Sequence, residues 1–322
     1  MDASLIWYYL LIFIILFAGI LVYFKIAGKY NIIDKPNERS SHTRITLRGG
    51  GIIFYLGILL YFFTQGLLYP WFFIGLTLIA AISFADDIKP QSSKLRLLLH
   101  FIAMLSMFYQ WSLFSLPWYY TIVALVFCTG VLNAYNFMDG INGITGGYSF
   151  IIAMALWYIN SYQISFVDNN LIYYLLLSLL IFNFFNFRKK ARCFAGDVGS
   201  VSVAFILIFL SGCLIIKTAD FSYIILFVVY GVDSALTVIH RLILKEKIFE
   251  AHRKHAYQLM VNELKIPHVL VSSIYSSLQA IVIIGLFCFY EWRYLYLCLV
   301  IVILSLAYIL FKKKYFHLHL IK

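Results

Sequence analysis

Carboxylates occur at several points where an apolar segment of the chain ends. The motif Ala85-Asp86-Asp87 closes one such segment. Adjacent carboxylates repel each other, and the partial negative charge of a helix C-terminus adds to that repulsion. A cation is needed as compensation: a divalent metal, Lys94, or an ion that arrives with a substrate. A solvated helix end would explain the pair equally well, so this motif alone does not define a site.

A more specific polar run covers residues 133–147. Asn133, Asn136 and Asp139 recur every three residues, which predicts roughly one helical face at the end of an apolar helix. The glycines that follow allow the backbone to approach a ligand closely. Polar side chains at a membrane edge are costly unless they contact something polar. Helix caps and turns would explain Gly140 and Asn142, but not the whole run.

A third polar segment begins at Phe194 and reads Phe-Ala-Gly-Asp-Val-Gly-Ser, directly after four cations at 188–192. Asp197 could cap a helix that starts here. It could equally bind a metal ion, with backbone amides directed at a phosphate. Both interpretations stay open at this point.

The last polar segment holds His252 and His255, three residues apart, with Arg253 and Lys254 between them. The intervening charges disfavour a metal and favour an anion. A solvated amphipathic helix end is the alternative.

Asp233 lies inside an apolar segment, well before this polar run. An acid at such a depth is functional or paired by default. Contact with a substrate and a buried pairing with Arg241 are both open.

Together these segments combine carboxylates, amides, glycines and many cations. Carboxylate oxygens suit Mg²⁺, which usually binds through one or two of them plus substrate phosphates. Lysine, arginine and histidine suit a diphosphate. At a membrane, the combination predicts phosphoryl transfer between a soluble nucleotide and a lipid phosphate.

The composition indicates the membrane. The chain has 322 residues, of which 63% are hydrophobic and 12% charged. A soluble domain is roughly 45–50% apolar and about 25% charged. The polar surface is too small to coat a water-exposed globule, so we expect an all-α polytopic membrane protein. The net charge of +11 is then explained by basic residues in cytoplasmic loops, and nucleic acid is not an expected partner.

A hydrocarbon core about 30 Å thick requires roughly 20 apolar residues in a helix. This length predicts about eleven transmembrane helices. Their ranges are 4–25, 49–68, 70–85, 96–113, 118–135, 144–162, 170–187, 200–216, 221–240, 268–290 and 293–311.

The basic residues predict the orientation of these spans. If the N-terminus is periplasmic and the C-terminus cytoplasmic, all 25 Lys and Arg residues except Lys217 and Arg293 fall on the cytoplasmic side. The exterior loops are short. We therefore expect one transmembrane catalytic domain over residues 1–322 in the bacterial inner membrane, with a cytoplasmic active site. Its predicted active-site loops lie near 28–48, 86–96, 133–147, 188–199 and 241–267.

These residues resemble the polyprenyl-phosphate N-acetylhexosaminyl-1-phosphate transferases. That family includes the phospho-MurNAc-pentapeptide translocase and the enzymes that initiate O-antigen and teichoic acid assembly. The resemblance covers about residues 30–260 and follows an ordered set of motifs. They are residues 34–42, Arg48-Gly-Gly-Gly51, Asp86-Asp87, Lys94-Leu-Arg96, and residues 133–140, 194–200 and 252–258.

The resemblance implies transfer from a UDP-N-acetylhexosamine to undecaprenyl phosphate, with release of UMP and with Mg²⁺, or Mn²⁺ in its place, as cofactor. Asp197 is similar in position to the main magnesium ligand, and Asp87 and Asn136 are the further expected metal ligands. Asp86 and Asp87 match carboxylates at the reacting phosphates, and either could deprotonate the lipid phosphate. His255, the remaining catalytic candidate, matches a diphosphate contact.

The resemblance also implies a set of substrate contacts. Phe194 stands where the family stacks an aromatic ring on uracil, and Asn136 and Asp139 match a motif that supports the nucleotide and the metal. The expected substrate-binding residues are Arg48, Lys94, Asn133, Asn136, Asp139, Phe194, His252 and Arg253.

One position departs from the pattern of many members, which carry a second histidine where this chain has Tyr257. The form HRxHxYQ resembles the subgroup that starts O-antigen units with N-acetylfucosamine, N-acetylquinovosamine or N-acetylglucosamine. The expected partners are undecaprenyl phosphate, the UDP-sugar and membrane lipids; a monomer and a homodimer both stay open.

Two other functions are alternatives, one from another class and one that shares the chemistry. A transporter of lipid-linked or nucleotide sugars is the main alternative, but transporters place ionisable residues near the middle of the membrane. A CDP-alcohol phosphotransferase would require a D-x-x-D-G-x-x-A-R motif, which this sequence lacks.

Overall fold

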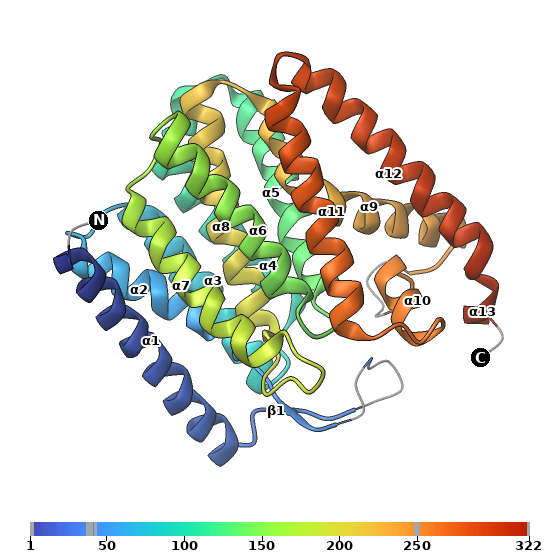
Figure 1. Ribbon diagram of the computed structural model, residues 1–322, viewed down its shortest axis with the longest axis horizontal. Coiled ribbons are helices and arrows are strands. Elements are labelled where there is room, and N and C mark those ends of the chain that lie inside the picture. The colour runs from blue at the N-terminus through green and yellow to red at the C-terminus, as the bar shows by residue number, and fades with distance from the viewer. Residues whose placement is uncertain (1–2, 37–40, 42–43, 248–251, 321–322) are drawn as a thin grey trace.

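The computed structural model describes residues 3–36, 41, 44–247 and 252–320. Parts of two predicted active-site loops, at 37–40, 42–43 and 248–251, lie outside the described residues. The described chain is almost entirely helical, as predicted (Figure 1). Its long helices are α1 (Ala3–Lys29), α2 (Ile52–Thr64), α3 (Pro70–Ile88), α4 (Ser93–Gln110), α5 (Trp118–Met138), α6 (Ile144–Tyr158), α7 (Asn169–Asn186), α8 (Gly196–Thr218), α9 (Val228–Ile243), α11 (His268–Cys288) and α12 (Arg293–Tyr315).

Short elements connect these helices. They are β1 (Ile33–Asp34), β2 (Thr46–Leu47), α10 (Ala256–Asn262), α13 (His317–Leu320), the 3₁₀ turns η1 (Leu113–Ser115), η3 (Phe221–Phe227) and η4 (Tyr290–Trp292), and a π-helical turn η2 (Ile159–Gln163).

Each predicted span overlaps a helix, but eight helical segments in the described chain are long and apolar enough to cross a membrane. The other three are α2 and α6, with 13 and 15 residues, and α4, which carries Lys94, Arg96 and His100. The structure therefore supports a polytopic membrane protein. The count of eleven and the orientation of the termini stay predictions.

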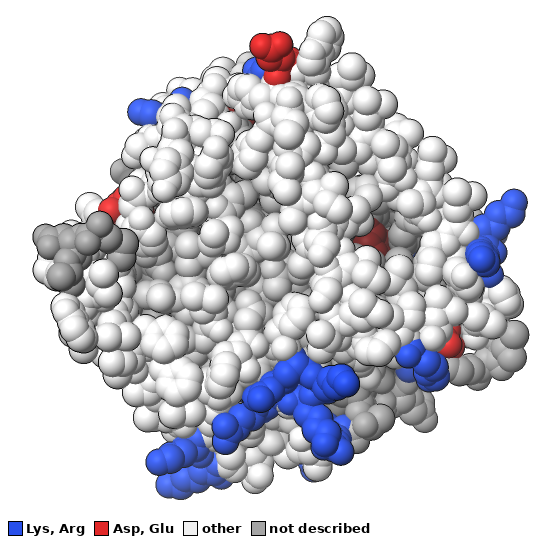
Figure 2. All heavy atoms as spheres, viewed as in Figure 1, with Lys and Arg blue, Asp and Glu red and all other residues white. Residues whose placement is uncertain are grey.

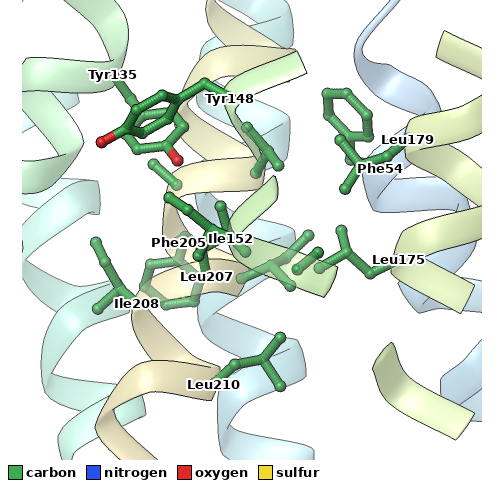
Figure 3. Close-up of a cluster of buried hydrophobic side chains, with 14 of the residues drawn as sticks. Phe54, Tyr135, Tyr148, Ile152, Leu175, Leu179, Phe205, Leu207, Ile208 and Leu210 are labelled. Atoms are coloured by element: carbon green, nitrogen blue, oxygen red, sulfur yellow. The ribbon is translucent and has the colours of Figure 1, made fainter. Parts of the chain in front are cut away.

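Helix α8 lies at the centre of the helical bundle. Its apolar stretch is 78% buried, against 17% for α1 and for α12 at the periphery. Figure 3 shows why: Phe205, Leu207 and Leu210 of α8 lie among side chains from the surrounding helices, including Ile152 of α6. Phe72 of α3 stacks on Phe205 and Phe209 of α8 as well. A helix that is apolar on all sides can be enclosed by other helices or can face lipid; α8 is enclosed.

The loops that carry the polar motifs meet at one end of the bundle. In Figure 2, Lys and Arg side chains gather mainly along the rim where Figure 1 places β1, α10 and the end of α12. The broad face between the two ends is nearly free of charge. This separation is the arrangement expected when an apolar belt lies in lipid and the charged loops lie in water.

Candidate active site

Asp87 is in the last turn of α3, because the helix extends three residues beyond its predicted end. Its side chain is completely buried. One carboxylate oxygen accepts the backbone N–H of Asp197 (2.9 Å), and the other accepts that of Val198 (3.0 Å). Arg48 Nε lies 2.7 Å from the same carboxylate. Asp87 thus stabilises the N-terminus of α8, where unpaired N–H groups favour an anion.

This arrangement requires glycine at the start of α8. Gly196 has a φ of +71°, and a Cβ atom there would lie 2.4 Å from Asp87 Oδ2. A non-glycine residue would be strained and would also displace the carboxylate. The motif Gly196-Asp197 therefore turns the chain sharply and brings the α8 amides onto Asp87. The backbone N–H groups of Asp197 and Val198 already bond to Asp87. The interpretation that backbone amides here point at a phosphate is therefore wrong for these two groups.

A second glycine-rich segment brings Arg48 into the cluster. Gly50 and Gly51 donate their backbone N–H groups to the carbonyls of Phe194 (2.8 Å) and Ala195 (3.0 Å). A Cβ atom on Gly51 would lie 2.3 Å from the Cα atom of Gly199. The two backbones can approach this closely only because both positions lack a side chain.

Strand β2 sets the register of this contact. Leu47 pairs with Ile33 of β1 and forms a parallel bridge to Cys193. Its carbonyl also accepts the Phe194 N–H (2.8 Å). The backbone of Phe194 is therefore fixed, and its side chain is half-buried beside the cluster.

Asp86 and Asp197 form the accessible part of the cluster. Their side chains are 11% and 23% exposed, whereas that of Asp87 is 0% exposed. Their carboxyl groups lie close enough for the charge of each to act on the other. Arg96 Nη1 lies 3.1 Å from Asp86 and 3.8 Å from Asp197. Two carboxylates this close, reachable from solvent, are the groups able to bind a cation.

Asn136 and Arg48 complete the surroundings of Asp197. Asn136 Nδ2 donates to Asp197 Oδ1 (3.1 Å), and Arg48 Nη2 lies 3.6 Å from the same oxygen. Helices α3, α5 and α8 and the glycine-rich segment after β2 all contribute to this cluster. Of the predicted site residues, the structure brings Arg48, Asp86, Asp87, Asn136 and Asp197 into direct contact.

Asp139 lies at the edge of this cluster. Helix α5 ends at Met138, so Asp139 has left the helical face predicted for it. Thr145 Oγ1 donates to its carboxylate (2.7 Å). Burial, together with the nearby negative charge of Asp87, raises the pKa of Asp139 to about 7. Asp139 can therefore exchange a proton near neutral pH.

Tyr257, which follows His255 by two residues, has a packing role. It is fully buried, and its hydroxyl donates to the carbonyl of Phe137 (2.9 Å). A Cβ atom on Gly140 would lie 2.2 Å from that hydroxyl. Tyr257 thus ties the C-terminal end of α5 to α10.

His255 is buried at the N-terminus of α10, where its backbone N–H is accepted by Gln258 Oε1 (3.2 Å). Its Nδ1 lies 3.2 Å from Asp233 Oδ1. Arg241 Nε instead lies 3.2 Å from Glu246, so the predicted alternative of an Asp233–Arg241 pair is wrong.

His252 stacks on His255, with ring centroids 5.1 Å apart. Burial, together with nearby His255 and Arg241, lowers the pKa of His252 to about 3. His252 is therefore neutral at pH 7 and can contact a phosphate only as an N–H donor. Arg253 is partly exposed beside it.

Two predicted substrate contacts lie apart from the cluster. Lys94 in the first turn of α4 and Asn133 on α5 are exposed, and neither hydrogen-bonds to the cluster within the described residues. Arg96, two residues after Lys94, takes the place expected of a cation. The sequence signal for it was present in the motif Lys94-Leu-Arg96, but only the helix start at Ser93 decides which side chain faces Asp86.

The donor set suits a hard divalent ion only in part. Among the described residues, no group of three or more His, Cys, Asp or Glu side chains is arranged to hold a metal. Asp86, Asp197 and the amide oxygen of Asn136 provide the oxygen chemistry that Mg²⁺ or Mn²⁺ favours. Mg²⁺ commonly binds one or two carboxylates and takes its other ligands from substrate phosphates and water. The residues thus fit a metal that shares its ligands with a substrate.

The chain is similar to known transferases. A family model described as Glycosyl transferase family 4 matches residues 69–215. The probable undecaprenyl-phosphate N-acetylglucosaminyl 1-phosphate transferase of Bacillus subtilis (strain 168) is 25% identical over 259 residues, which cover 74% of this chain and 72% of the relative.

Two other relatives match shorter stretches. The undecaprenyl-phosphate alpha-N-acetylglucosaminyl 1-phosphate transferase of Yersinia pestis is 28% identical over 227 residues, covering 62% of this chain and 60% of the relative. The phospho-N-acetylmuramoyl-pentapeptide-transferase of Petrotoga mobilis is 30% identical over 178 residues, covering 48% of this chain and 55% of that protein.

Proposed function

We propose that this chain transfers an N-acetylhexosamine 1-phosphate from a UDP-sugar to undecaprenyl phosphate and releases UMP at the cytoplasmic face of the bacterial inner membrane. The observation that carries the proposal is the convergence of Asp86, Asp197, Arg48 and Arg96 with Asn136. These residues come from segments far apart in sequence and meet at the charged end of an otherwise apolar bundle. The names of the three relatives support the reaction class.

The proposed reaction is a direct displacement at phosphorus. An oxygen of the lipid phosphate forms a bond to the phosphorus that bears the sugar, and the bond from that phosphorus to the oxygen of UMP breaks. Phosphoryl transfer of this kind depends mainly on positioning and on stabilising charge. Arg48 and Arg96, whose side chains are 33% and 38% exposed, can each turn N–H donors toward the diphosphate oxygens.

Within this proposal, Asp197 and Asp86 hold the divalent ion and Asn136 supports Asp197. When bound, Mg²⁺ or Mn²⁺ would neutralise diphosphate charge. Asp87 was predicted as a metal ligand, but its oxygens already accept three donors. We therefore propose that Asp87 acts by holding α8 and Arg48 in place. Phe194 remains the proposed stacking partner for uracil.

A covalent route would pass through an aspartyl phosphate on Asp86 or Asp87, with UMP leaving first. The burial of Asp87 and its three donors disfavour it as a nucleophile. Incubation with a UDP-sugar labelled in the sugar-bearing phosphate, without lipid acceptor, is expected to leave the protein unlabelled. Label retained on an aspartate would contradict direct displacement.

The sugar is proposed from the form HRxHxYQ at 252–258, which favours N-acetylfucosamine, N-acetylquinovosamine or N-acetylglucosamine and an O-antigen unit as product. The test is UMP release by purified protein with undecaprenyl phosphate, a panel of UDP-sugars, and added Mg²⁺, Mn²⁺ or chelator. We expect release with at least one UDP-N-acetylhexosamine and none with chelator. Uptake of a lipid-linked or nucleotide sugar into vesicles without any UMP release would instead support transport.

A further inference from the structure

A buried acid–histidine pair connects α9 to the start of α10. Asp233 is 3% exposed and His255 is 2% exposed, and Asp233 Oδ1 lies 3.2 Å from His255 Nδ1. Carboxylates buried in a membrane protein are costly unless they are paired. Asp233 was singled out by its depth in the sequence, and the cluster around Asp197 does not use it.

The other partners of Asp233 determine which nitrogen of His255 carries hydrogen. Asp233 accepts the backbone N–H of Ala256 (3.1 Å) and the hydroxyls of Thr237 (3.2 Å) and Tyr275 (2.5 Å). All three are donors, as expected around an ionised carboxylate, which can only accept. His255 Nδ1 therefore donates to Asp233, and Nε2 is on the side of the ring turned away from it.

His255 Nε2 is buried and has no hydrogen-bond partner among the described residues. A buried polar atom without a partner is uncommon and costly. Gln258 Oε1 accepts the backbone N–H of His255 (3.2 Å), and Asp233 Oδ1 lies 3.2 Å from ring Nδ1, so both the backbone and one ring nitrogen are held. The atom is thus in place for a group that the protein itself does not supply.

The ring packs against the C-terminal end of α5, which reaches the candidate active site. Its centroid lies 6.1 Å from that of Phe137 and 5.8 Å from that of Tyr257. Phe137 directly follows Asn136, whose amide donates to Asp197. His255 and the carboxylate cluster therefore both contact the last turn of α5.

We propose that Asp233 is a positioning residue that directs His255 Nε2–H at a diphosphate oxygen of the nucleotide sugar, an inference that rests on the proposed function. Ionised phosphate oxygens only accept hydrogen bonds, so Nε2 must carry hydrogen while Nδ1 donates to Asp233. The Asp233 carboxylate fixes the orientation of the ring, as a carboxylate does behind a catalytic histidine.

The test is a double-mutant cycle with Asp233→Asn, His255→Gln and both changes together. Asn keeps the shape of the side chain but removes the charge. We expect Asp233→Asn to lower kcat for UMP release by roughly 10²-fold with a much smaller change in KM, because the contact strengthens as charge develops on the leaving group. In the His255→Gln background, the same change is expected to have almost no further effect.

A matched control removes a different partner of the same carboxylate. Tyr275→Phe deletes the hydroxyl that bonds to Asp233 Oδ2 and leaves the contact with His255 intact, so kcat is expected to stay within about fivefold of the parent. If Asp233→Asn does not yield folded protein, the cycle is run with Asp233→Glu, which keeps the charge but moves it by one methylene. The effect of Asp233→Glu on kcat is again expected to disappear in the His255→Gln background.

Equal losses from the Asp233 change in both backgrounds would overturn the proposal, because a purely structural role does not depend on His255. A loss confined to KM would overturn it as well. These results are distinct from failure of the proposed function, which would show as absence of UMP release by the parent protein with every UDP-sugar. In that case the inference falls with the function.

Discussion

Replacement of Asp87 by asparagine tests whether this residue supports the fold of the site. Asparagine keeps one acceptor oxygen but turns an NH₂ group toward donors that now bond to the carboxylate. Breaking a buried ion pair costs roughly 3–5 kcal/mol. Arg48 is 33% exposed and can regain water, so the lower value, about 3 kcal/mol, applies. This corresponds to roughly a hundredfold increase in local opening at the start of α8.

Cys193 offers a local measurement of that opening. Its side chain is buried, and a Cβ atom on Gly50 would lie 2.5 Å from its sulfur. Alkylation of Cys193, followed by mass spectrometry of its peptide in detergent-purified protein, reports how often this contact separates. We expect Asp87→Asn to increase the rate by roughly a hundredfold, in proportion to the opening equilibrium.

Asp86→Asn is the matched control, since it neutralises the neighbouring carboxylate. Asp86 accepts from Gln91 and Arg96, and no hydrogen bond joins it to the α8 backbone within the described residues. Its Cys193 alkylation rate is expected to stay within about twofold of the parent, while UMP release is lost. Unchanged alkylation in Asp87→Asn, or equal increases in both variants, would refute the reasoning.

Three further predictions concern the same end of the bundle. Asp197→Asn is expected to abolish UMP release without lowering the thermal unfolding midpoint, because it relieves repulsion from the neighbouring carboxylates. Asp168→Asn, on the opposite side, is expected to leave UMP release nearly unchanged. An equal loss of activity in both variants would contradict the proposed site. Because burial raises the pKa of Asp139 to about 7, the folded state binds its proton more tightly than the unfolded state, so stability falls as pH rises from about 4 to 7. Asp139→Asn is expected to flatten that slope in unfolding measured without divalent ions; an unchanged slope would exclude Asp139 as its source. Gly51→Ala is expected to cost at least about 2 kcal/mol and most activity, because the new methyl group overlaps the backbone of Gly199; a fully active variant would show that the two segments can separate.

The helices could be predicted from sequence because apolar length is a local property. Each predicted range overlaps a helix, and the errors are at the ends. Helix α3 continues to Ile88 and α8 begins at Gly196, so both acid motifs belong to helices rather than to loops. These ends depend on each other: α3 can end in carboxylates because α8 begins against them.

The partners within the site could not be predicted in the same way. Asp87 and Val198 are 111 positions apart, and no local pattern shows which of two adjacent acids faces inward. The two-residue strands β1 and β2 have no periodicity to detect. For Asp233, depth in an apolar segment was a true signal of pairing, but its partner lay beyond a loop.

The occupied amides at the start of α8 have a consequence for substrate selection. A helix N-terminus that is free can receive a phosphate in a rigid ring of backbone donors, but here Asp87 already fills that position. An anionic substrate would then be bound by guanidinium groups on long, flexible side chains. Guanidinium groups on flexible side chains recognise the charge of a ligand more strictly than its shape. Related proteins could therefore accept a different sugar on the diphosphate without any change at this end of the bundle.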